Sequence, residues 1–321
     1  MESGGSKVSI IIPNYNGREF LKRLLSSIAK QTYVDFEVII IDDASPDRTV
    51  VEYIREFIKD HTNMRLIENS ENLGFVKTCN KGFGLAEGDY ICLLNNDTEV
   101  KSNFVERNIE ILDADSSIGV LSCIIVDGEG NNWFTGGSFR EGLPVNLKDD
   151  FPNIRNVDWV AGTAAFYRRD VLDTVGFLNE EFFMYHEDID FCLRVRNETD
   201  YKVSMFAEKL VTHYVEGEPC IQNFFRPGWD ILYYLGLKRS LKEAVQTTVD
   251  RVYYYGRRNH MLLLRRYCPK YIPKILKRNL VAIISIPIYA ISKRSFALLL
   301  LSPHWIILII RGTLSGLTRM Q

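Results

Sequence analysis

The stretch VSIIIPNYNGREFLKRLLSSI, residues 8–28, decides the fold. It opens with an apolar run rich in β-branched residues, continues through the polar turn NYNG, and then places apolar residues along one helical face. The same order of strand, loop and helix recurs three times. Strands are predicted at FEVIIID (36–42), MRLIE (64–68) and DYICLLNND (89–97), and helices at residues 48–59, 76–86 and 103–113. With a fifth strand at IGVLSCIIV (118–126), this alternation predicts an α/β fold, whose mostly parallel central sheet carries helices on both faces.

Charge is distributed unevenly along the 321 residues. Lys and Arg number 17 against 3 Asp and Glu in residues 226–321, but 22 against 38 in residues 1–225. The hydrophobic fraction of 46% is ample for a packed core, which excludes disorder as the main state. We therefore expect a flexible tail at residues 1–6, an acidic folded domain at residues 7–225, and a basic, partly apolar helical region at residues 226–321.

The cysteines indicate a reducing environment. They form no CxxC pair and no metal-like spacing, and four of the six lie in apolar runs. Reduced, buried thiols are therefore expected, a state typical of the cytosol. The first residues, MESGGSK, contain no apolar segment of the kind that directs secretion.

Polar clusters follow three of the predicted strands: Asn14 to Asn16, Asp42 with Asp43, and Asn95 to Asp97. In open α/β sheets, ligands bind beyond the carboxyl ends of the strands, so these clusters predict one site at one edge. The alternative is that each cluster only makes turns and helix caps. If the ligand is a nucleotide diphosphate, carboxylates would repel its phosphates unless Mg²⁺ or Mn²⁺ bound both. Asp97 is placed for that metal, Asp43 could accept the N3–H of uracil or thymine, and Tyr15 could stack on the base.

Residues 156–215 are rich in polar and aromatic side chains. A helix is predicted to begin near Glu187, with Glu187, Asp188 and Asp190 in its first turn. The helix dipole accounts for carboxylates there without any catalysis, and Asp190 is spaced for an i,i+4 pair with Arg194. The Gly-rich stretch FTGGSFREGLP (134–144) is expected to be an ordinary loop.

Several motifs occur together in one order: VSIIIPNYNG, VIIIDDAS, NLGFVKTCNKGF, AEGDYICLLNNDTEV, GTAAFYRRDVLDTVGFLNEEFFMYHEDIDFCLR and VTHYVEG. Over residues 7–216 the chain resembles the inverting family 2 glycosyltransferases, close to their rhamnosyltransferase-like branch. The resemblance implies a GT-A fold, a nucleotide-sugar donor and a divalent metal, and it makes residues 7–225 the catalytic domain.

Carried over to this sequence, the resemblance assigns donor and metal contacts to three segments. Asp43 matches the carboxylate that recognises the base, and Pro13, Tyr15 and Asn16 match the donor loop. Asn95, Asn96 and Asp97 match the metal-binding DxD element. Asn95 replaces the first acid, so Asp97 is the only charged ligand in that motif. Lys77 could contact the donor or be solvated on its helix.

The resemblance also assigns residues to catalysis and to the acceptor. Asp188 matches the catalytic base, with Glu187 as its nearest rival. His213 matches a position that in some relatives binds the metal or the diphosphate, although a structural role is an alternative. Trp159, Gly162, Thr163 and Asp190 are assigned to the acceptor side, where Trp159 is either an aromatic plate for a sugar or a core residue.

The basic region suggests a lipid surface. Two apolar blocks, LVAIISIPIYAIS from Leu280 and FALLLLSPHWIILII from Phe296, have 13 and 15 residues, fewer than the ~20 that a membrane-spanning helix needs. Upstream, YYYGRRNHMLLLRRYCPKYIPKILKR (253–278) mixes aromatics, leucines and cations as interfacial helices do. We expect peripheral attachment to the cytoplasmic face of the cell membrane. Packing on the catalytic domain and a dimer interface are alternatives, oligomers are possible, and no motif indicates nucleic acid.

Three functions follow from these observations. The first is a metal-dependent inverting glycosyltransferase, hexosyl or rhamnosyl, that moves a sugar from a UDP- or dTDP-sugar to a hydroxyl of a glycan or polyprenyl-linked acceptor. The second is a non-catalytic glycan- or nucleotide-binding protein with the same fold, which the Asn95 replacement would suit. The third, a nucleotidyltransferase, requires a phosphate loop rich in Gly, Lys and Arg, which PNYNGREF does not supply.

Overall fold

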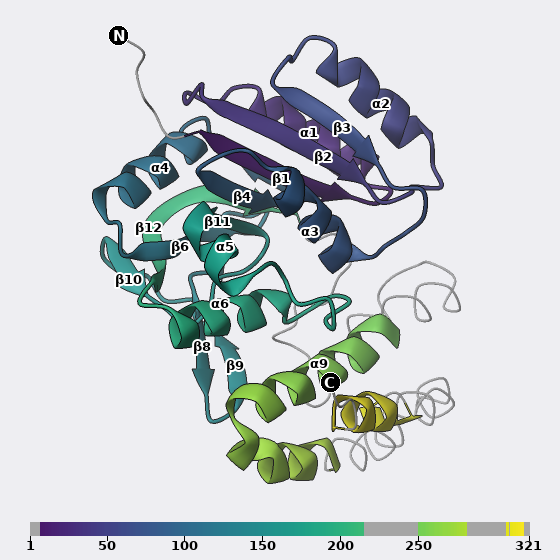
Figure 1. The fold of residues 1–321 in the computed structure, drawn as a ribbon, viewed down its shortest axis with the longest axis vertical. Helices are drawn as coiled ribbons and strands as arrows, with labels where there is room; N and C mark the ends of the chain where they lie inside the picture. The colour runs from purple at the N-terminus through teal and green to yellow at the C-terminus, as the bar shows by residue number, and fades with distance from the viewer. Residues whose placement is uncertain (1–6, 215–249, 281–305, 308, 318–321) are drawn as a thin grey trace. The chain divides into compact units, whose positions relative to one another are not determined.

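The computed structural model describes residues 7–214, 250–280, 306–307 and 309–317 (Figure 1). The described residues form two compact units. The first comprises residues 7–138 and 146–214, and the second comprises residues 139–145 together with the described residues from 250 onward. The expected tail at residues 1–6, the expected boundary near residue 225 and most of the two apolar blocks lie outside the described residues.

Strands and helices alternate through the first 114 residues, as the sequence predicts. Between residues 7 and 214 the elements are β1 (Val8–Asn14), α1 (Arg18–Ile28), β2 (Phe36–Asp42), α2 (Thr49–Ile58), β3 (Met64–Glu68), α3 (Phe75–Leu85), β4 (Tyr90–Leu94), β5 (Thr98–Val100), α4 (Phe104–Ala114), β6 (Ile118–Val126), β7 (Asn132–Phe134), β8 (Gly137–Arg140), β9 (Leu143–Asn146), β10 (Ile154–Asn156), β11 (Ala164–Arg168), α5 (Arg169–Val175), α6 (Glu187–Glu198) and β12 (Lys202–His213).

The central sheet has ten strands, eight of them in the order β10-β12-β6-β11-β4-β1-β2-β3. The strands β3, β2, β1 and β4 are parallel, and Ile10 of β1 lies beside Val38 on one side and Cys92 on the other. Helical crossovers between parallel strands produce this arrangement. The prediction of an α/β fold built on a largely parallel sheet is confirmed. The antiparallel strand β11, between β4 and β6, makes the sheet mixed.

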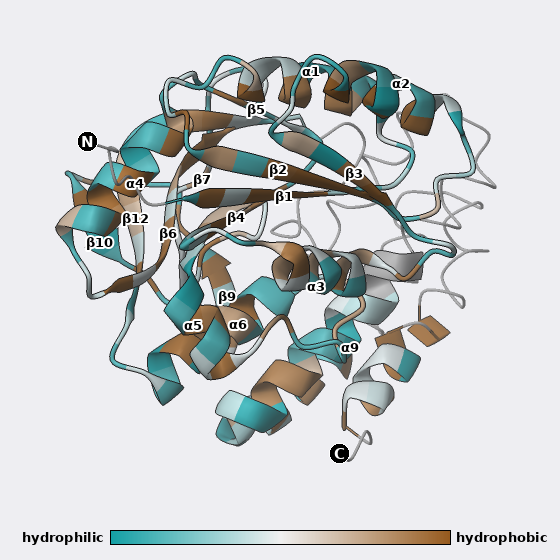
Figure 2. Ribbon diagram, turned by 45° about the horizontal axis from the view of Figure 1, so that its top comes forward, coloured by the Kyte–Doolittle hydropathy of each residue, from teal (hydrophilic) through white to brown (hydrophobic). Residues whose placement is uncertain are grey.

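Helices cover both faces of this sheet. Figure 2 shows α1 and α2 on one face and α3, α5 and α6 on the other. The strands β1, β4 and β6 are buried along their whole length, which explains their continuous apolar sequences. At Gly82 of α3, an added Cβ would lie 2.2 Å from Ile11 Cγ2 and 2.7 Å from Ile41 Cδ1. A glycine there lets α3 pack closely on β1 and β2.

The Gly-rich stretch at residues 134–144 is a β-hairpin, so its prediction as an ordinary loop was wrong. The strands β8 and β9 pair with each other in a separate two-stranded sheet. Glu141 and Gly142 turn the chain with φ values of 50° and 77°. Two successive positive φ values are typical of a type I′ hairpin turn, in which a glycine at the second position is favoured.

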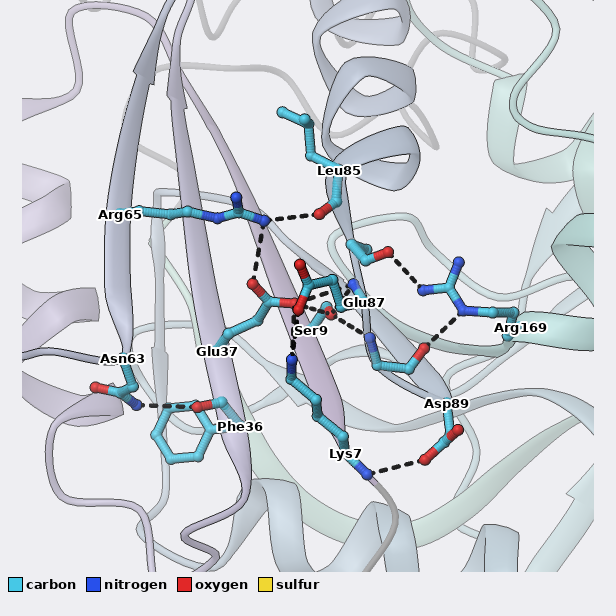
Figure 3. A network of polar contacts seen from close by, with 12 residues as sticks. Lys7, Ser9, Phe36, Glu37, Asn63, Arg65, Leu85, Glu87, Asp89 and Arg169 are labelled. Carbon is cyan, nitrogen blue, oxygen red and sulfur yellow. Dashed lines mark hydrogen bonds and ion pairs between the residues drawn. The ribbon is translucent and has the colours of Figure 1, made fainter.

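The edge of the sheet at the amino ends of β1 and β2 carries a network of paired polar groups (Figure 3). Glu37 accepts hydrogen bonds at both carboxylate oxygens, from Ser9 Oγ at 2.7 Å and from Arg65 at 3.2 Å. Lys7 Nζ donates to Glu87 at 2.8 Å, and Ser9 Oγ accepts from the backbone N–H of Gly88 at 2.8 Å. The carboxylates at this edge are therefore used to hold the fold together.

The second unit is helical around a small apolar core. It contains α9 (Asp250–Tyr267), the 3₁₀ turn η3 (Pro269–Tyr271), and helices over residues 272–280 and 309–317. Met261, Leu264 and Ile275 form the buried core, with Phe139 and Leu143 of the hairpin packed against it. In the described residues, no helix combines the length and apolar character that crossing a membrane requires.

The described cysteines are free thiols, as expected: Cys79, Cys92, Cys123 and Cys192 are buried, and Cys268 is half-buried. Cys220 lies outside the described residues.

Candidate active site

Asn14, the last residue of β1, connects the three polar clusters at the carboxyl edge of the sheet. Its Nδ2 donates to Asp42 Oδ1 at 2.9 Å, and its Oδ1 accepts from Asn96 Nδ2 at 2.8 Å. Ser45 Oγ donates to Asp42 Oδ1 at 2.5 Å, and the backbone N–H of Asn16 donates to Ser45 Oγ at 2.9 Å. The ends of β1, β2 and β4 therefore meet in one place, as their polar clusters predict.

The loop after β1 is shaped by Asn16 and Gly17. Asn16 has a left-handed φ of 55°. A Cβ at Gly17 would lie 2.0 Å from Asn96 Nδ2, so only glycine leaves room for the Asn96 side chain. Tyr15 is 46% exposed, whereas Pro13 is buried under the loop. The Tyr15 ring is thus available for stacking on a base at the edge of the site.

Asp43 is buried and holds the loop before α3. Its Oδ1 accepts from Asn69 Nδ2 and from the backbone N–H of Leu73, both at 2.8 Å, and its Oδ2 accepts from the backbone N–H of Gly74 at 2.9 Å. Because a carboxylate oxygen has two lone pairs, Oδ2 can accept one further donor. The geometry of Asp43 is compatible with a base N–H that donates to Oδ2. Asp43 also has a structural role, because it holds the loop before α3.

Asp97 and His213 lie side by side, brought together by the pairing of β5 with β12. His213 Nε2 is 3.2 Å from Asp97 Oδ2. The backbone N–H of Tyr214 donates to the Asp97 carbonyl at 2.9 Å. The His213 ring meets the edge of Trp133 with centroids 4.5 Å apart, which fixes its plane. Two positions separated by 116 residues in the sequence are therefore adjacent.

The atoms around Asp97 suit a divalent cation. Two adjacent ligands of an octahedral cation, each at about 2.1 Å, lie about 3.0 Å apart, close to the Asp97–His213 separation. Asp97 Oδ1 and Asn95 Oδ1 are buried and accept no hydrogen bond. Buried oxygens normally have a positive partner, so both atoms favour a cation. Asn95 thus offers an amide oxygen where the motif usually has an acid.

The number of charged ligands at this position is small. In the described part of the chain, no group of three or more His, Cys, Asp or Glu side chains is arranged as a metal site. Mg²⁺ and Mn²⁺ are usually bound by one or two carboxylates, with phosphate oxygens and water completing the shell. The arrangement therefore fits a metal that binds together with a diphosphate, rather than a metal held by protein alone.

Asp188, in the first turn of α6, is held next to the end of β4. The backbone N–H groups of Gly162 and Ile189 donate to its Oδ2 at 3.1 Å and its Oδ1 at 2.8 Å. The neighbouring Thr163 carbonyl accepts from the backbone N–H of Asn95 at 2.9 Å. The segment 162–163 thus bridges the candidate base and the candidate metal motif.

Glu187 and Asp188 differ in environment. Glu187 is 7% exposed and its Oε2 is buried without a hydrogen-bond donor, whereas Asp188 remains partly exposed. Burial, and then the negative charges of Asp188 and Asp190, raise the pKa of Glu187 to about 8. Burial also raises the pKa of Asp188, against the opposing effect of backbone N–H donors that include Gly162 and Ile189. Glu187 therefore holds a proton at neutral pH, and Asp188 is the more accessible of the two acids.

A strained turn precedes these carboxylates. Tyr185 and His186 have left-handed φ values of 67° and 71°. Non-glycine residues in this conformation cost about 1 kcal/mol or more each and persist where the surroundings impose them, often at functional sites. Upstream, Asn80 of α3 holds the chain by donating to the Leu178 carbonyl at 2.8 Å and accepting from the Leu178 N–H at 3.0 Å.

The other residues predicted to contact the acceptor or the donor range from buried to exposed. Trp159 is buried against Phe134, with ring centroids 5.0 Å apart, and matches the alternative of a core residue. Asp190 is fully buried, with its Oδ2 3.1 Å from Arg194 Nε, as the i,i+4 spacing predicts. Lys77 is exposed on α3. Gly162 and Thr163 lie beside Asp188.

The candidate site contains buried carboxylate oxygens that accept no hydrogen bond. In the residues that the structure describes, two buried carboxylate oxygens accept no hydrogen bond, and these are Asp97 Oδ1 and Glu187 Oε2. At the opposite edge, both oxygens of Glu37 are paired. Burial, and then the carboxylates of Glu187 and Asp43, raise the pKa of the Cys79 thiol, so those two carboxylates lie near one buried residue.

Sequence reasoning missed several residues that build this site. Gly17, Asn69, Gly74 and Trp133 each position a candidate residue. Gly17 carries a local signal because it sits in the polar turn after the first strand. Asn69 and Trp133 carry none, since their partners are distant in sequence.

The sequence profile of Glycosyl transferase family 2 matches residues 9–176, which is more than half of the chain. The chain belongs to glycosyl transferase family 2. The amylovoran biosynthesis glycosyltransferase AmsB of Erwinia amylovora is 25% identical over 213 residues, covering 64% of this chain and 69% of AmsB. Further curated glycosyltransferases match over 45–58% of their own length, so this family 2 chain spans about half of each.

Solved structures share the fold of this family 2 chain. The mannosyltransferase PcManGT from Pyrobaculum calidifontis, in complex with GDP-Man and Mn²⁺, aligns with a TM-score of 0.55 at 17% identity, covering 99% of this chain and 89% of PcManGT. S. aureus TarS 1–349, in complex with UDP-GlcNAc, aligns with a TM-score of 0.55 at 19% identity, covering 97% and 89%. The fold is GT-A, as the resemblance implies.

Proposed function

We propose that this family 2 protein is an inverting glycosyltransferase that uses a nucleotide-sugar donor and a divalent cation. The observation that carries the proposal is the pair of unsatisfied buried carboxylate oxygens, Asp97 Oδ1 and Glu187 Oε2, at the carboxyl edge of the sheet. Asp97, His213 and the Asn95 amide oxygen would hold Mn²⁺ or Mg²⁺, which when bound would supply positive charge beside the diphosphate of the donor.

In this proposal Asp188 is the general base. The acceptor hydroxyl loses its proton to Asp188 as its oxygen forms a bond to the anomeric carbon of the donor sugar. The bond from that carbon to the diphosphate breaks, and the nucleoside diphosphate leaves with the electron pair. A single displacement inverts the anomeric configuration. The backbone donors Gly162 and Ile189 aim the carboxylate and keep it from rotating.

Glu187 is the positioning partner of this base. It holds a proton at neutral pH because its pKa is about 8, so it adds no second negative charge beside Asp188. Its buried Oε2 can pair with a hydroxyl of the bound donor or acceptor sugar.

A uracil or thymine base suits the nucleotide end of the site. Asp43 Oδ2 retains capacity for one more donor, and an N3–H supplies it, while the exposed Tyr15 ring offers a stacking surface. The proposed donor is therefore a UDP- or dTDP-sugar carrying a hexose, including rhamnose. AmsB is named for amylovoran biosynthesis, and a similar hexosyltransferase of Haloferax volcanii is named for glycan biosynthesis, which supports a polysaccharide or polyprenyl-linked glycan as the proposed acceptor.

One observation favours a second function. Asn95 replaces an acid, so Asp97 is the single charged residue of its motif. A protein of this kind could bind a nucleotide or glycan without turnover. The two functions differ in whether a product forms, not in whether a nucleotide binds.

The test is a donor screen with product analysis. Purified protein, Mn²⁺ and a panel of UDP-, dTDP- and GDP-sugars are incubated with membrane extract as the acceptor source, and products are followed by mass spectrometry. The proposal expects a glycosylated product from a UDP- or dTDP-sugar, with inverted anomeric configuration by NMR. Nucleotide binding by calorimetry without transfer or donor hydrolysis would favour the non-catalytic function, and a retained configuration would overturn the mechanism.

A further inference from the structure

Helix 272–280 of the second unit exposes a mixed face of apolar residues and one cation. Pro273, Leu276, Lys277 and Leu280 are all exposed, with Leu276 at 36% and Leu280 at 56%. Their spacing of i, i+3, i+4 and i+7 places them on one side of the helix. The side chain of Ile275, by contrast, is buried in the core of the unit.

The helical segment of residues 306–307 and 309–317 exposes a face with the same pattern. Ile307, Ile310, Arg311 and Leu314 are exposed at i, i+3, i+4 and i+7, with the three apolar residues at 51%, 41% and 53%. Each helix therefore presents three apolar residues and one cation in the same order.

The opposite sides of these helices form the packing contacts of the unit. Asn279 Nδ2 donates to Thr313 Oγ1 at 3.1 Å, so the two helices are joined through buried polar groups. A Cβ at Gly312 would lie 2.6 Å from the Tyr254 carbonyl, and one at Gly316 would lie 2.4 Å from the Arg258 carbonyl. Glycines at this spacing let the helix pack closely on α9. Among the described residues, these contacts are made by the buried sides of the two helices and not by the exposed faces.

We propose that these two faces dock the protein on an anionic lipid bilayer, with each helix lying in the plane of the interface. Apolar side chains enter the boundary between head groups and acyl chains, and the aliphatic stems of Lys277 and Arg311 let their charges reach the lipid phosphates. Attachment through these faces is peripheral, because each helix lies along the interface instead of crossing it.

Charge identifies lipid rather than a protein as the occupant. Residues 226–321 contain 17 Lys and Arg against 3 Asp and Glu, although the whole chain has a net charge of −2. Protein–protein interfaces exclude lysine from their apolar centre, whereas interfacial helices on anionic lipid place cations among apolar residues. A second copy of the chain would set one cationic face against another.

The experiment is co-sedimentation of the full-length protein with vesicles of phosphatidylglycerol and phosphatidylcholine, or of phosphatidylcholine alone. We expect strong binding to the anionic vesicles that weakens as salt is raised, because each cation contributes about fivefold in partitioning. A double variant, Leu276→Asp with Ile310→Asp, should lose at least about tenfold in partitioning. Val34→Asp is the matched control, because Val34 is 85% exposed in the first unit, and it should bind like the wild type.

Two further measurements keep the test decisive. The variant Lys277→Gln with Arg311→Gln removes charge but no apolar area, so it should reduce binding to anionic vesicles more than to neutral ones. Thermal unfolding by circular dichroism verifies that each variant folds. Equal partitioning of the aspartate variant and the wild type, or salt-independent binding, would overturn the proposal. A dimer by light scattering that the aspartate variant abolishes without lipid would show that the faces bind a second copy instead.

Discussion

His213 Nε2 lies 3.2 Å from Asp97 Oδ2, although 116 residues separate them in the sequence. The contact exists because β12 pairs antiparallel with β5, in the register that sets His213 opposite Thr98. Asp97 is the last residue of the DxD-like motif, so His213 lies beside that motif. Two groups at this separation can bind the same cation.

Replacing Asp97 should abolish the metal response. We expect Asp97→Asn to lower transfer by at least about 100-fold, because it removes the one charged ligand of the motif. His213→Ala should raise the Mn²⁺ concentration for half-maximal rate by about tenfold. Rates measured against Mn²⁺ concentration distinguish these effects. Full activity of the wild type in excess EDTA would exclude a metal-dependent step.

Asp188→Asn should remove the base and leave donor binding intact. The expected loss in kcat is about 10²- to 10⁴-fold, the usual contribution of a general base. The wild-type rate should fall as pH is lowered, with a limb above the ordinary aspartate pKa of 3.8, because burial raises the pKa of Asp188. Steady-state kinetics against pH measure both effects.

Asp173→Asn is the matched control for that experiment, because Asp173 is an exposed carboxylate on α5. It should keep the wild-type rate and pH profile. If Asp188→Asn were as active as this control, and Glu187→Gln inactive, the roles of the two acids would be reversed.

Glu187→Gln should change how stability depends on pH. In the folded wild type the pKa of Glu187 is raised from 4.5 to about 8. A raised carboxyl pKa means that the stability due to the protonated form is complete below pH 4.5 and is lost as pH rises to about 8. Glutamine does not titrate. The free energy of unfolding of the variant should therefore rise relative to that of the wild type between pH 5 and pH 9, by a few kcal/mol at most. Denaturant unfolding of both proteins at pH 5 and pH 9 tests this. If the two free energies of unfolding differed by the same amount at both pH values, Glu187 would not be buried in its protonated form.

Gly17→Ala should reduce activity with little effect on the fold. Its Cβ would lie 2.0 Å from Asn96 Nδ2, so Asn96 must move away from Asn14. Gly84→Ala on α3 is the control, since its Cβ meets only Phe177 at 3.8 Å. We expect a rise of about tenfold in the donor KM for Gly17→Ala and none for Gly84→Ala. If the donor KM were unchanged in both variants, the hydrogen bond between Asn14 and Asn96 would play no part in donor binding.

Local patterns predict the parallel half of the sheet, because each strand, turn and helix between residues 8 and 114 is encoded over a short stretch. The same patterns place Asn14, Asp43 and Asp97 at one edge, since parallel strands end together. The antiparallel insertion of β11 between β4 and β6 depends on long-range pairing, which periodicity does not reveal. The hairpin at Glu141 and Gly142 was missed because its strands are short and three glycines interrupt the stretch 134–144.

The chemistry of individual side chains was less predictable than their position. Asp43 appeared to be a ligand for a base, yet the folded chain also uses it to hold Leu73 and Gly74. Trp159 could be a sugar plate or a core residue from its sequence alone, and its burial against Phe134 depends on tertiary packing that the sequence does not show. The difference between Glu187 and Asp188 is one of burial, which depends on the tertiary structure of segment 160–190.

The most direct measurement is a crystal structure of the protein with Mn²⁺ and UDP or dTDP, recorded with anomalous scattering from manganese. We predict one manganese peak about 2.1 Å from an Asp97 carboxylate oxygen and from a diphosphate oxygen, with Asp188 facing the same cavity. A nucleotide bound with its diphosphate and metal away from Asp97, or Asp188 separated from that cavity, would contradict it.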